Sequence, residues 1–189
     1  MELTKESLFE KDLEGKVIIF KTDTVYGIGA LLNDERAIER IYEIKKRDKK
    51  NPLAVLVDHE ETARRLVQDP SRVMPYMKAY WPGALTLVTK KSDEVSDSVT
   101  RGKDTVGIRM PDDPDALAIL SHFGPMAVTS LNLSSEPPVL KYRDALEFED
   151  SVDYIVKGED LDSPASTVYD VDRGVVLRQG SITVDPDAL

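Results

Sequence analysis

Short apolar segments bounded by turn residues alternate along this chain with stretches of helical periodicity, and this alternation restricts the fold to a mixed α/β architecture. The first apolar segment, Val17 to Phe20, predicts a buried strand. A cap at Asn33 or Asp34, followed by apolar residues at helical spacing, predicts a helix that ends near Arg47. Further strands are expected at 53–57, 84–89, 105–111, 126–129 and 153–156, and further helices at 60–67, 71–80, 114–122 and 142–146.

The last part of the chain predicts a β-hairpin. Two β-rich runs, 166–171 and 175–178, flank Asp172-Arg173-Gly174, and a glycine-containing turn between such runs is a hairpin signal. The 189 residues contain no internal repeat, low-complexity segment or linker. A single α/β domain spanning residues 1–189 is therefore expected.

Composition excludes several classes of site. The absence of cysteine rules out disulfides and thiolate chemistry, and two histidines cannot build a histidine-rich metal site, so no protein-held metal is expected. No apolar run approaches membrane-spanning length and the N-terminus lacks a signal-peptide core, which predicts a cytoplasmic protein with no membrane contact. The net charge of −10 argues against long-range attraction to nucleic acid.

Hydroxyl groups gather where the first predicted strand ends. Thr22, Thr24 and Tyr26 follow that strand, and Ser130 and Asn132 follow the strand at 126–129. Ligands of open α/β sheets bind outside the carboxyl ends of strands, so these side chains point to a small-molecule site. Taken alone, a Thr-X-Thr pair is more often a pair of β-branched strand residues.

Five cations occupy the six positions from Lys45 to Lys50. Lys45 and Arg47 converge on one anion only if the helix ends between or just after them, and the segment from Asp48 to Pro52 provides such an end. Arginine binds phosphate in a bidentate manner while lysine acts as a point charge, so the pair suits a polyphosphate. The alternative is a solvated helix terminus whose cations match the macrodipole.

Other motifs do not support a competing chemistry. Gly27 and Gly29 lack the third glycine of a dinucleotide fingerprint and the Lys-Ser or Lys-Thr of a P-loop. Ser130 matches no nucleophile elbow and is expected to bind rather than attack. His59 is interpreted as a surface residue and His122 as a structural one. A divalent ion would arrive with a phosphate ligand, as Mg²⁺ usually does.

Seven blocks in a fixed order resemble the YrdC/Sua5 family of threonylcarbamoyl-AMP synthases, over about residues 15–182. The blocks are Lys21-Thr22-Asp23-Thr24-Val25-Tyr26-Gly27, Ile44-Lys45-Lys46-Arg47 with Asn51-Pro52-Leu53, Trp81-Pro82-Gly83-Ala84-Leu85-Thr86, Asp104-Thr105-Val106-Gly107-Ile108-Arg109-Met110-Pro111, Thr129-Ser130-Leu131-Asn132-Leu133-Ser134, Ser166-Thr167-Val168 and Leu177-Arg178-Gln179-Gly180.

The resemblance implies a short, single-domain synthase with an open, twisted mixed sheet, flanking helices and a concave, positively charged ligand face. It implies that L-threonine, bicarbonate and ATP, with Mg²⁺ carried by the phosphates, yield threonylcarbamoyl-AMP and pyrophosphate. Partner proteins would then transfer the group to tRNA as the t6A modification next to the anticodon. It also implies catalytic roles for Lys45, Arg47, Ser130 and Asn132, ATP binding by Arg47, Asn51, Thr105, Ser130 and Arg178, and threonine binding by Thr22, Thr24, Arg109 and Ser166.

The chain departs from the family pattern at Lys21, Asp48, Leu131 and Ser135, and Leu131 is expected to narrow the pocket. Two other functions remain open. One is a paralogue without synthase activity that acts as an RNA-binding module through the basic run, whereas a synthase is expected to bind RNA only weakly. The other is an adenylation module of the hydrogenase-maturation type that uses carbamoyl phosphate.

Overall fold

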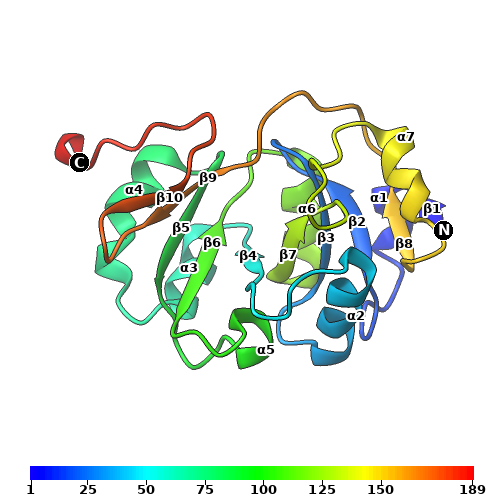
Figure 1. Ribbon diagram of the computed structural model, residues 1–189, viewed down its shortest axis with the longest axis horizontal. Coiled ribbons are helices and arrows are strands. Elements are labelled where there is room, and N and C mark those ends of the chain that lie inside the picture. The colour runs from blue at the N-terminus through cyan, green and yellow to red at the C-terminus, as the bar shows by residue number, and fades with distance from the viewer.

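A single ten-stranded mixed sheet organises the computed structural model, which describes residues 1–189. The strands are β1 (Glu2–Leu3), β2 (Ile18–Lys21), β3 (Tyr26–Leu31), β4 (Ala54–Leu56), β5 (Leu85–Lys90), β6 (Thr105–Arg109), β7 (Met126–Ser130), β8 (Tyr154–Val156), β9 (Thr167–Asp170) and β10 (Val175–Arg178). They lie in the order β1-β8-β2-β3-β7-β4-β6-β5-β9-β10. The strand order places the two chain termini at opposite ends of the molecule (Figure 1).

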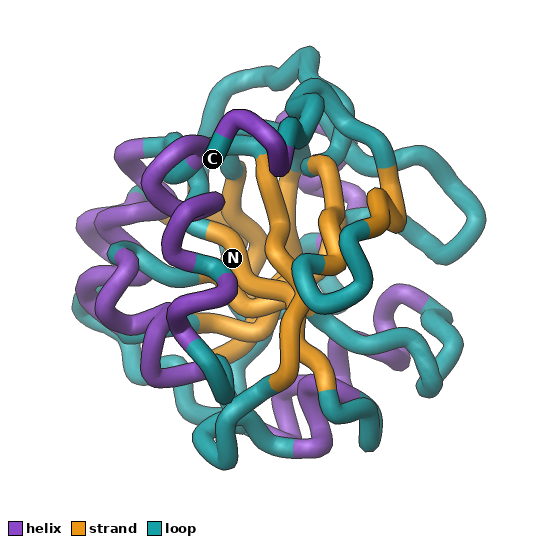
Figure 2. Tube along the Cα trace, turned by 90° about the vertical axis from the view of Figure 1, so that its left-hand side faces the viewer, coloured by secondary structure: helices purple, strands orange, loops and turns teal.

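Seven α-helices flank the sheet, on both of its sides (Figure 2). They are α1 (Lys5–Leu8), α2 (Glu35–Lys45), α3 (Glu60–Leu66), α4 (Met74–Tyr80), α5 (Asp97–Thr100), α6 (Pro114–Phe123) and α7 (Tyr142–Ala145), with 3₁₀ helices at Pro70–Arg72, Leu146–Phe148 and Pro186–Ala188. None of the helices has both the length and the apolar composition needed to cross a bilayer.

Most of the predicted elements are confirmed, including the antiparallel β9–β10 hairpin and the expected mixed α/β class. The elements β1, α1, α5 and β3 were not expected from the sequence. Strand β3 contains two glycines, which are poor strand formers. A Cβ atom at Gly27 or Gly29 would lie 2.9 or 2.8 Å from a methyl group of Val128 on β7. Close packing between β3 and β7 therefore explains both glycines, and no local signal indicates it.

Residues at the two ends of helix α2 determine where it begins and ends. The Asp34 side chain accepts a hydrogen bond from the Ala37 amide at 3.1 Å, which caps the first turn. The helix stops at Lys45 because Lys46 adopts a left-handed conformation with φ of 51°. The chain thus turns between Lys45 and Arg47, as the expected convergence of these two cations requires.

Two apolar clusters stabilise the two faces of the sheet. A cluster of 30 buried residues joins one face to α2, α3 and α4, and it contains Ile19 and Val55. A cluster of 12 buried residues joins the other face to α1 and α6, and it contains Ile18 and Phe20. Adjacent residues of β2 thus enter opposite clusters, as the two-residue period of a strand requires.

The second face is covered by α6 only near β2, β3 and β7. Beyond them, alternate residues of β4, β6, β5 and β9 line a cavity, among them Ala54, Gly107, Thr86 and Val168. This part of the sheet face is therefore available to a ligand.

Candidate functional site

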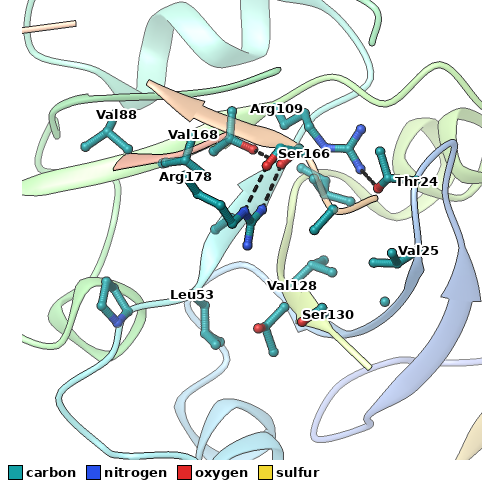
Figure 3. A pocket seen from close by; sticks show the side chains of 18 of the residues that line it. Thr24, Val25, Leu53, Val88, Arg109, Val128, Ser130, Ser166, Val168 and Arg178 are labelled. Carbon is teal, nitrogen blue, oxygen red and sulfur yellow. Dashed lines mark hydrogen bonds between the residues drawn. The ribbon is translucent and has the colours of Figure 1, made fainter. Parts of the chain in front are cut away.

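A cavity of about 350 Å³ lies on this uncovered face and is lined by residues from both halves of the sheet (Figure 3). Eight of the eleven residues predicted from the sequence line the cavity: Thr22, Thr24, Arg47, Thr105, Arg109, Ser130, Ser166 and Arg178. The remaining three, Lys45, Asn51 and Asn132, do not. The structure thus brings eight of the predicted residues together around one cavity, and the other three lie behind or beside its wall.

One end of the cavity is lined by two hydrogen-bonded groups of side chains, here together called the buried end and defined as Thr22, Thr24, Thr86, Arg109 and Ser166. Each of these residues is at most 6% exposed. The Thr22 and Thr24 hydroxyls lie 3.1 Å apart, and Thr22 Oγ1 donates to the Val25 carbonyl. Because both hydroxyls belong to the turn between β2 and β3, the turn itself fixes their positions.

Arg109 joins this turn to β6. Its Nη2 donates to Thr24 Oγ1 at 3.1 Å (Figure 3). Its Nη1 forms an ion pair with Asp23 Oδ1 at 2.6 Å. A buried guanidinium is costly unless it is paired, and Asp23 supplies the pairing. The role of Asp23 is thus to hold Arg109, rather than to act as a general base.

Ser166 completes the buried end from β9. Its hydroxyl lies 2.8 Å from Thr86 Oγ1, and Arg178 donates to both its Oγ and its carbonyl oxygen at 3.1 and 2.9 Å (Figure 3). Thr86 was not among the predicted site residues, although it falls within a quoted block. Its position on β5, one residue away from each of two core leucines, is the signal that places it on the cavity face.

The other end, here called the cationic end, is defined as Arg47, Lys103 and Arg178. Arg47 donates to the carbonyl oxygens of Asn51 and Pro52 at 3.3 and 2.8 Å. Arg178 likewise donates only to Ser166. Burial and the nearby charge of Arg109 lower the pKa of Arg178 from its ordinary value. Neutral acceptors leave these positive charges uncompensated, which is the electrostatic condition for binding an anion.

Lys103 has no counterpart in the sequence prediction. It precedes β6 by two residues and lines the cavity on the same side as Thr105 and Gly107. Only the two-residue period of the strand would have indicated its position.

Lys45 lies behind the wall and is 1% exposed, so its interpretation as a solvated helix terminus is wrong. Its ammonium donates to Ser130 O, to Asn132 Oδ1 at 2.7 Å and to Thr129 Oγ1 at 3.4 Å. Burial, together with the charge of Arg47, lowers the pKa of Lys45 to about 7. An anion in the cavity would raise this pKa again, because a nearby negative charge favours the protonated form.

Ser130 forms the cavity wall in front of Lys45, and Asn132 lies behind this wall. Ser130 Oγ donates to Asn132 Oδ1 at 3.1 Å, and Asn132 Nδ2 donates to the Glu136 carbonyl at 2.7 Å. Leu131 points away from the cavity into the main core and is fully buried, which contradicts the expectation that it narrows the pocket. The backbone carbonyl of Asn51 accepts a hydrogen bond from Arg47. Asn51 itself is exposed.

The two histidines have structural positions. His59 caps α3 by accepting from the Thr62 amide, and His122 stacks on Phe9 with ring centroids 4.6 Å apart. No group of three or more His, Asp or Glu side chains has an arrangement that could hold a metal ion.

The cavity combines buried hydroxyls and a paired guanidinium at one end with unpaired cations at the other.

The chain is similar to known proteins over most of its length. A family model for Sua5, YciO and YrdC proteins, described as Telomere recombination, matches residues 13–180. The chain is 39% identical over 178 residues to a Bacillus subtilis protein named threonylcarbamoyl-AMP synthase, and the match covers 90% of this chain and 51% of the relative.

Two solved structures share the fold. The P. abyssi Sua5 structure complexed with L-threonine aligns with a TM-score of 0.88 and 35% identity, covering 93% of this chain and 54% of that chain. E. coli YciO aligns with a TM-score of 0.87 and 28% identity, covering 96% and 91%. The chain spans about half the length of the B. subtilis and Pyrococcus abyssi relatives that it matches.

Proposed function

The chain belongs to the Sua5/YciO/YrdC family, and from that premise we propose that it is a threonylcarbamoyl-AMP synthase. It would convert L-threonine, bicarbonate and ATP to threonylcarbamoyl-AMP and pyrophosphate. The observation that carries the proposal is the division of one cavity into a buried end with Arg109 and hydroxyls, and a cationic end with unpaired arginines.

The buried end suits a small amino acid. The Arg109 guanidinium offers charge-assisted donors to a carboxylate, and the hydroxyls of Thr22, Thr24 and Ser166 can exchange hydrogen bonds with a threonine side chain. A ligand that displaces these hydrogen bonds without replacing them leaves buried polar groups unpaired, so the site discriminates against it. The structure of the related P. abyssi Sua5 in complex with L-threonine supports this assignment.

The cationic end suits the triphosphate of ATP. We assign ATP binding to Arg47, Asn51, Thr105, Ser130 and Arg178, with Lys103 as an additional cation. Arginine forks match phosphate oxygens, and Mg²⁺ would enter as the counterion of the phosphates, as part of the substrate. In this proposal, the cationic end is the concave, positively charged ligand face that the family resemblance implies.

The reaction needs alignment and charge stabilisation. The threonine amine adds to CO₂ derived from bicarbonate and loses a proton, giving a carbamate whose oxygen then attacks the α-phosphorus of ATP. A new O–P bond forms as the bond to the pyrophosphate oxygen breaks. Holding both substrates in one cavity supplies proximity, and the cations stabilise charge on the departing pyrophosphate.

We assign the catalytic group to Lys45, Arg47, Ser130 and Asn132. Arg47 and Ser130 reach the cavity directly, while Lys45 and Asn132 stand immediately behind Ser130 and hold it. The buried ammonium of Lys45 adds positive charge to this wall in a site of low dielectric, where its effect on phosphate is largest.

The product would pass to partner proteins that attach the threonylcarbamoyl group to tRNA for the t6A modification. In this proposal residues 1–189 act as one domain in the cytoplasm. The runner-up is a family paralogue that binds RNA through the basic run and makes no adenylate.

A pyrophosphate-release assay tests the proposal. We expect release only when ATP, L-threonine and bicarbonate are present together, with mass spectrometric detection of threonylcarbamoyl-AMP. Release independent of threonine, or release with carbamoyl phosphate in place of threonine and bicarbonate, contradicts it. Tight RNA binding at high salt without pyrophosphate release would favour the runner-up.

A further inference from the structure

Two segments far apart in sequence meet beside the buried end through a pair of salt bridges. One segment is the end of β2 with the following turn, and the other runs from the end of β6 to the start of α6. Arg109 pairs with Asp23 at 2.6 Å, and Lys21 pairs with Asp113 at 2.6 Å. Each segment thus supplies one cation and one anion, so the two bridges have opposite polarity.

Both bridges are largely removed from solvent. The side chains of Lys21 and Asp113 are 10% and 5% exposed, and those of Arg109 and Asp23 are 6% and 15% exposed. Charges at this depth are stable only when they are paired, and removing one partner leaves the other buried without compensation. The two segments are therefore held in one relative position at two points.

Lys21 is the cation on which Asp113 depends. Asp113 Oδ1 accepts from the Lys21 ammonium, while Asp113 Oδ2 is buried without a hydrogen-bond partner. Asp113 makes no side-chain capping bond to α6, although it occupies the N-cap position. Its carboxylate is thus directed at Lys21 instead of at the helix it begins.

The stem of Lys21 is also confined. A Cβ atom on Gly158 would lie 2.9 Å from Lys21 Cδ and 2.8 Å from the Tyr26 hydroxyl, so only glycine fits there. Lys21 Nζ also lies 3.5 Å from Glu159 and 3.7 Å from Asp115. Asp115 is in turn paired with Lys5 of α1 at 2.8 Å, at the outer margin of the same network.

We propose that Lys21 and Asp113 are positioning residues for the amino-acid half of the site, because their bridge holds the turn bearing Thr22 and Thr24 in register with Arg109. Lys21 directly precedes Thr22, and Asp113 lies four residues after Arg109. A loss of the bridge lets the turn move relative to the guanidinium, which weakens the contacts made by the buried end. None of the three cations of the cationic end belongs to either segment.

The inference rests on the proposed function, and its kinetic test separates the two substrates. In Lys21→Met and in the apolar pair Lys21→Met/Asp113→Leu, we expect KM for threonine to rise about tenfold, while KM for ATP changes less than about twofold. Lys21→Arg restores a cation and should recover most of the threonine affinity. Lys5→Met removes a cation from the same network without touching the turn, so its KM values should match the wild type.

Hydrogen exchange provides a readout that does not depend on catalysis. We expect the amides of residues 22–26 to exchange faster in Lys21→Met than in Lys5→Met, with protection elsewhere unchanged. If the wild type makes no adenylate, the proposed function fails and this contrast still tests the positioning role. Should Lys21→Met not fold, Asp113→Asn gives a milder loss of the same bridge.

The inference is overturned if KM for threonine and KM for ATP rise together, or if neither changes. It is also overturned if the exchange of residues 22–26 is the same in Lys21→Met, Lys5→Met and the wild type.

Discussion

The two ends of the cavity use polar groups in opposite ways. At the buried end every hydroxyl and the Arg109 guanidinium already have protein partners, and a carboxylate neutralises the cation. At the cationic end Arg47 and Arg178 donate only to neutral oxygens, and the segment around Arg47 is partly exposed. The first end is built before its ligand arrives, and the second is completed by its ligand.

This difference separates selectivity from charge attraction. A paired and buried network can distinguish small ligands by geometry, since each misplaced group leaves a buried partner unsatisfied. Unpaired cations at an open end attract polyphosphates strongly but with little discrimination. In the proposed reaction, the first property suits the choice of threonine and the second suits ATP.

The largest expected effect comes from breaking the buried end at Arg109. In Arg109→Leu, Asp23 becomes a buried carboxylate without its cation, so we expect the free energy of unfolding to fall by about 3 kcal/mol. Threonine-dependent pyrophosphate release should fall more than about a hundredfold, because a charge-assisted anchor is lost. Denaturant titration and single-substrate kinetics measure the two losses.

The double variant Arg109→Leu/Asp23→Leu is the matched control, since it removes both charges. It should recover most of the lost stability and none of the activity. Recovery of activity in the double variant would show that Arg109 does not contact the substrate.

Arg47→Ala tests the opposite end and should separate activity from stability. Because Arg47 donates to two backbone carbonyls at a partly exposed site, the loss in unfolding free energy should be about 1 kcal/mol. The value of kcat/KM for ATP should fall by about a hundredfold, as expected for one donor to a developing charge. Lys46→Ala, one residue away and exposed, serves as the control and should behave like the wild type. Near-normal turnover in Arg47→Ala contradicts the phosphate assignment.

The lowered pKa of Lys45 predicts that ATP binding is coupled to protonation of this side chain. Its pKa of about 7 leaves the ammonium largely deprotonated at pH 8, and phosphate charge in the cavity favours its protonation. We therefore expect ATP binding to take up protons at pH 8 and not at pH 6, with affinity falling as pH rises above 7. Calorimetry in buffers of different ionisation enthalpy measures the uptake, which Lys45→Met should abolish.

The same pKa shift has a stability consequence with a defined sign. Lysine has an ordinary pKa of 10.5, so between pH 7 and about 10.5 the unfolded chain binds more protons than the folded one. The free energy of unfolding of the wild type should thus rise with pH in this window, relative to Lys45→Met. A difference that is independent of pH would show that Lys45 is protonated in the fold throughout.

The smallest effect is expected from substitutions of lysines that lie outside the cavity. Lys46, Lys49 and Lys50 are exposed and do not line the site, so replacing all three with alanine should leave pyrophosphate release unchanged within about twofold. Any RNA binding should become weaker in the triple variant, which a filter-binding titration at two salt concentrations measures. Loss of adenylate formation would instead show that these three lysines belong to the cationic end.

Local chemistry explains which parts of the site could be predicted from sequence. The cap at Asp34 and the break after Lys45 are encoded within a few residues, and so α2 and the placement of Arg47 follow directly. The hydroxyls after β2 also follow, because strand ends are recognisable.

The missing parts depend on contacts between distant segments. The burial of Lys45 results from β7 passing across the end of α2, and the two glycines of β3 are required by Val128. Lys103 and Thr86 line the cavity because of the face of the sheet on which they lie. That sheet places strands side by side that are far apart in the sequence. The spacing of residues along the chain does not predict these contacts.

The cavity draws on residues from Thr22 near the beginning of the chain to Arg178 near its end. During synthesis, a chain that has not yet extended to β9 and β10 has neither the serine nor the arginine that closes the site. The many non-local strand pairings also imply slow folding, since loops must close before contacts form. A nucleotide that binds only the finished cavity therefore stabilises the completed chain over every shorter or partly folded form.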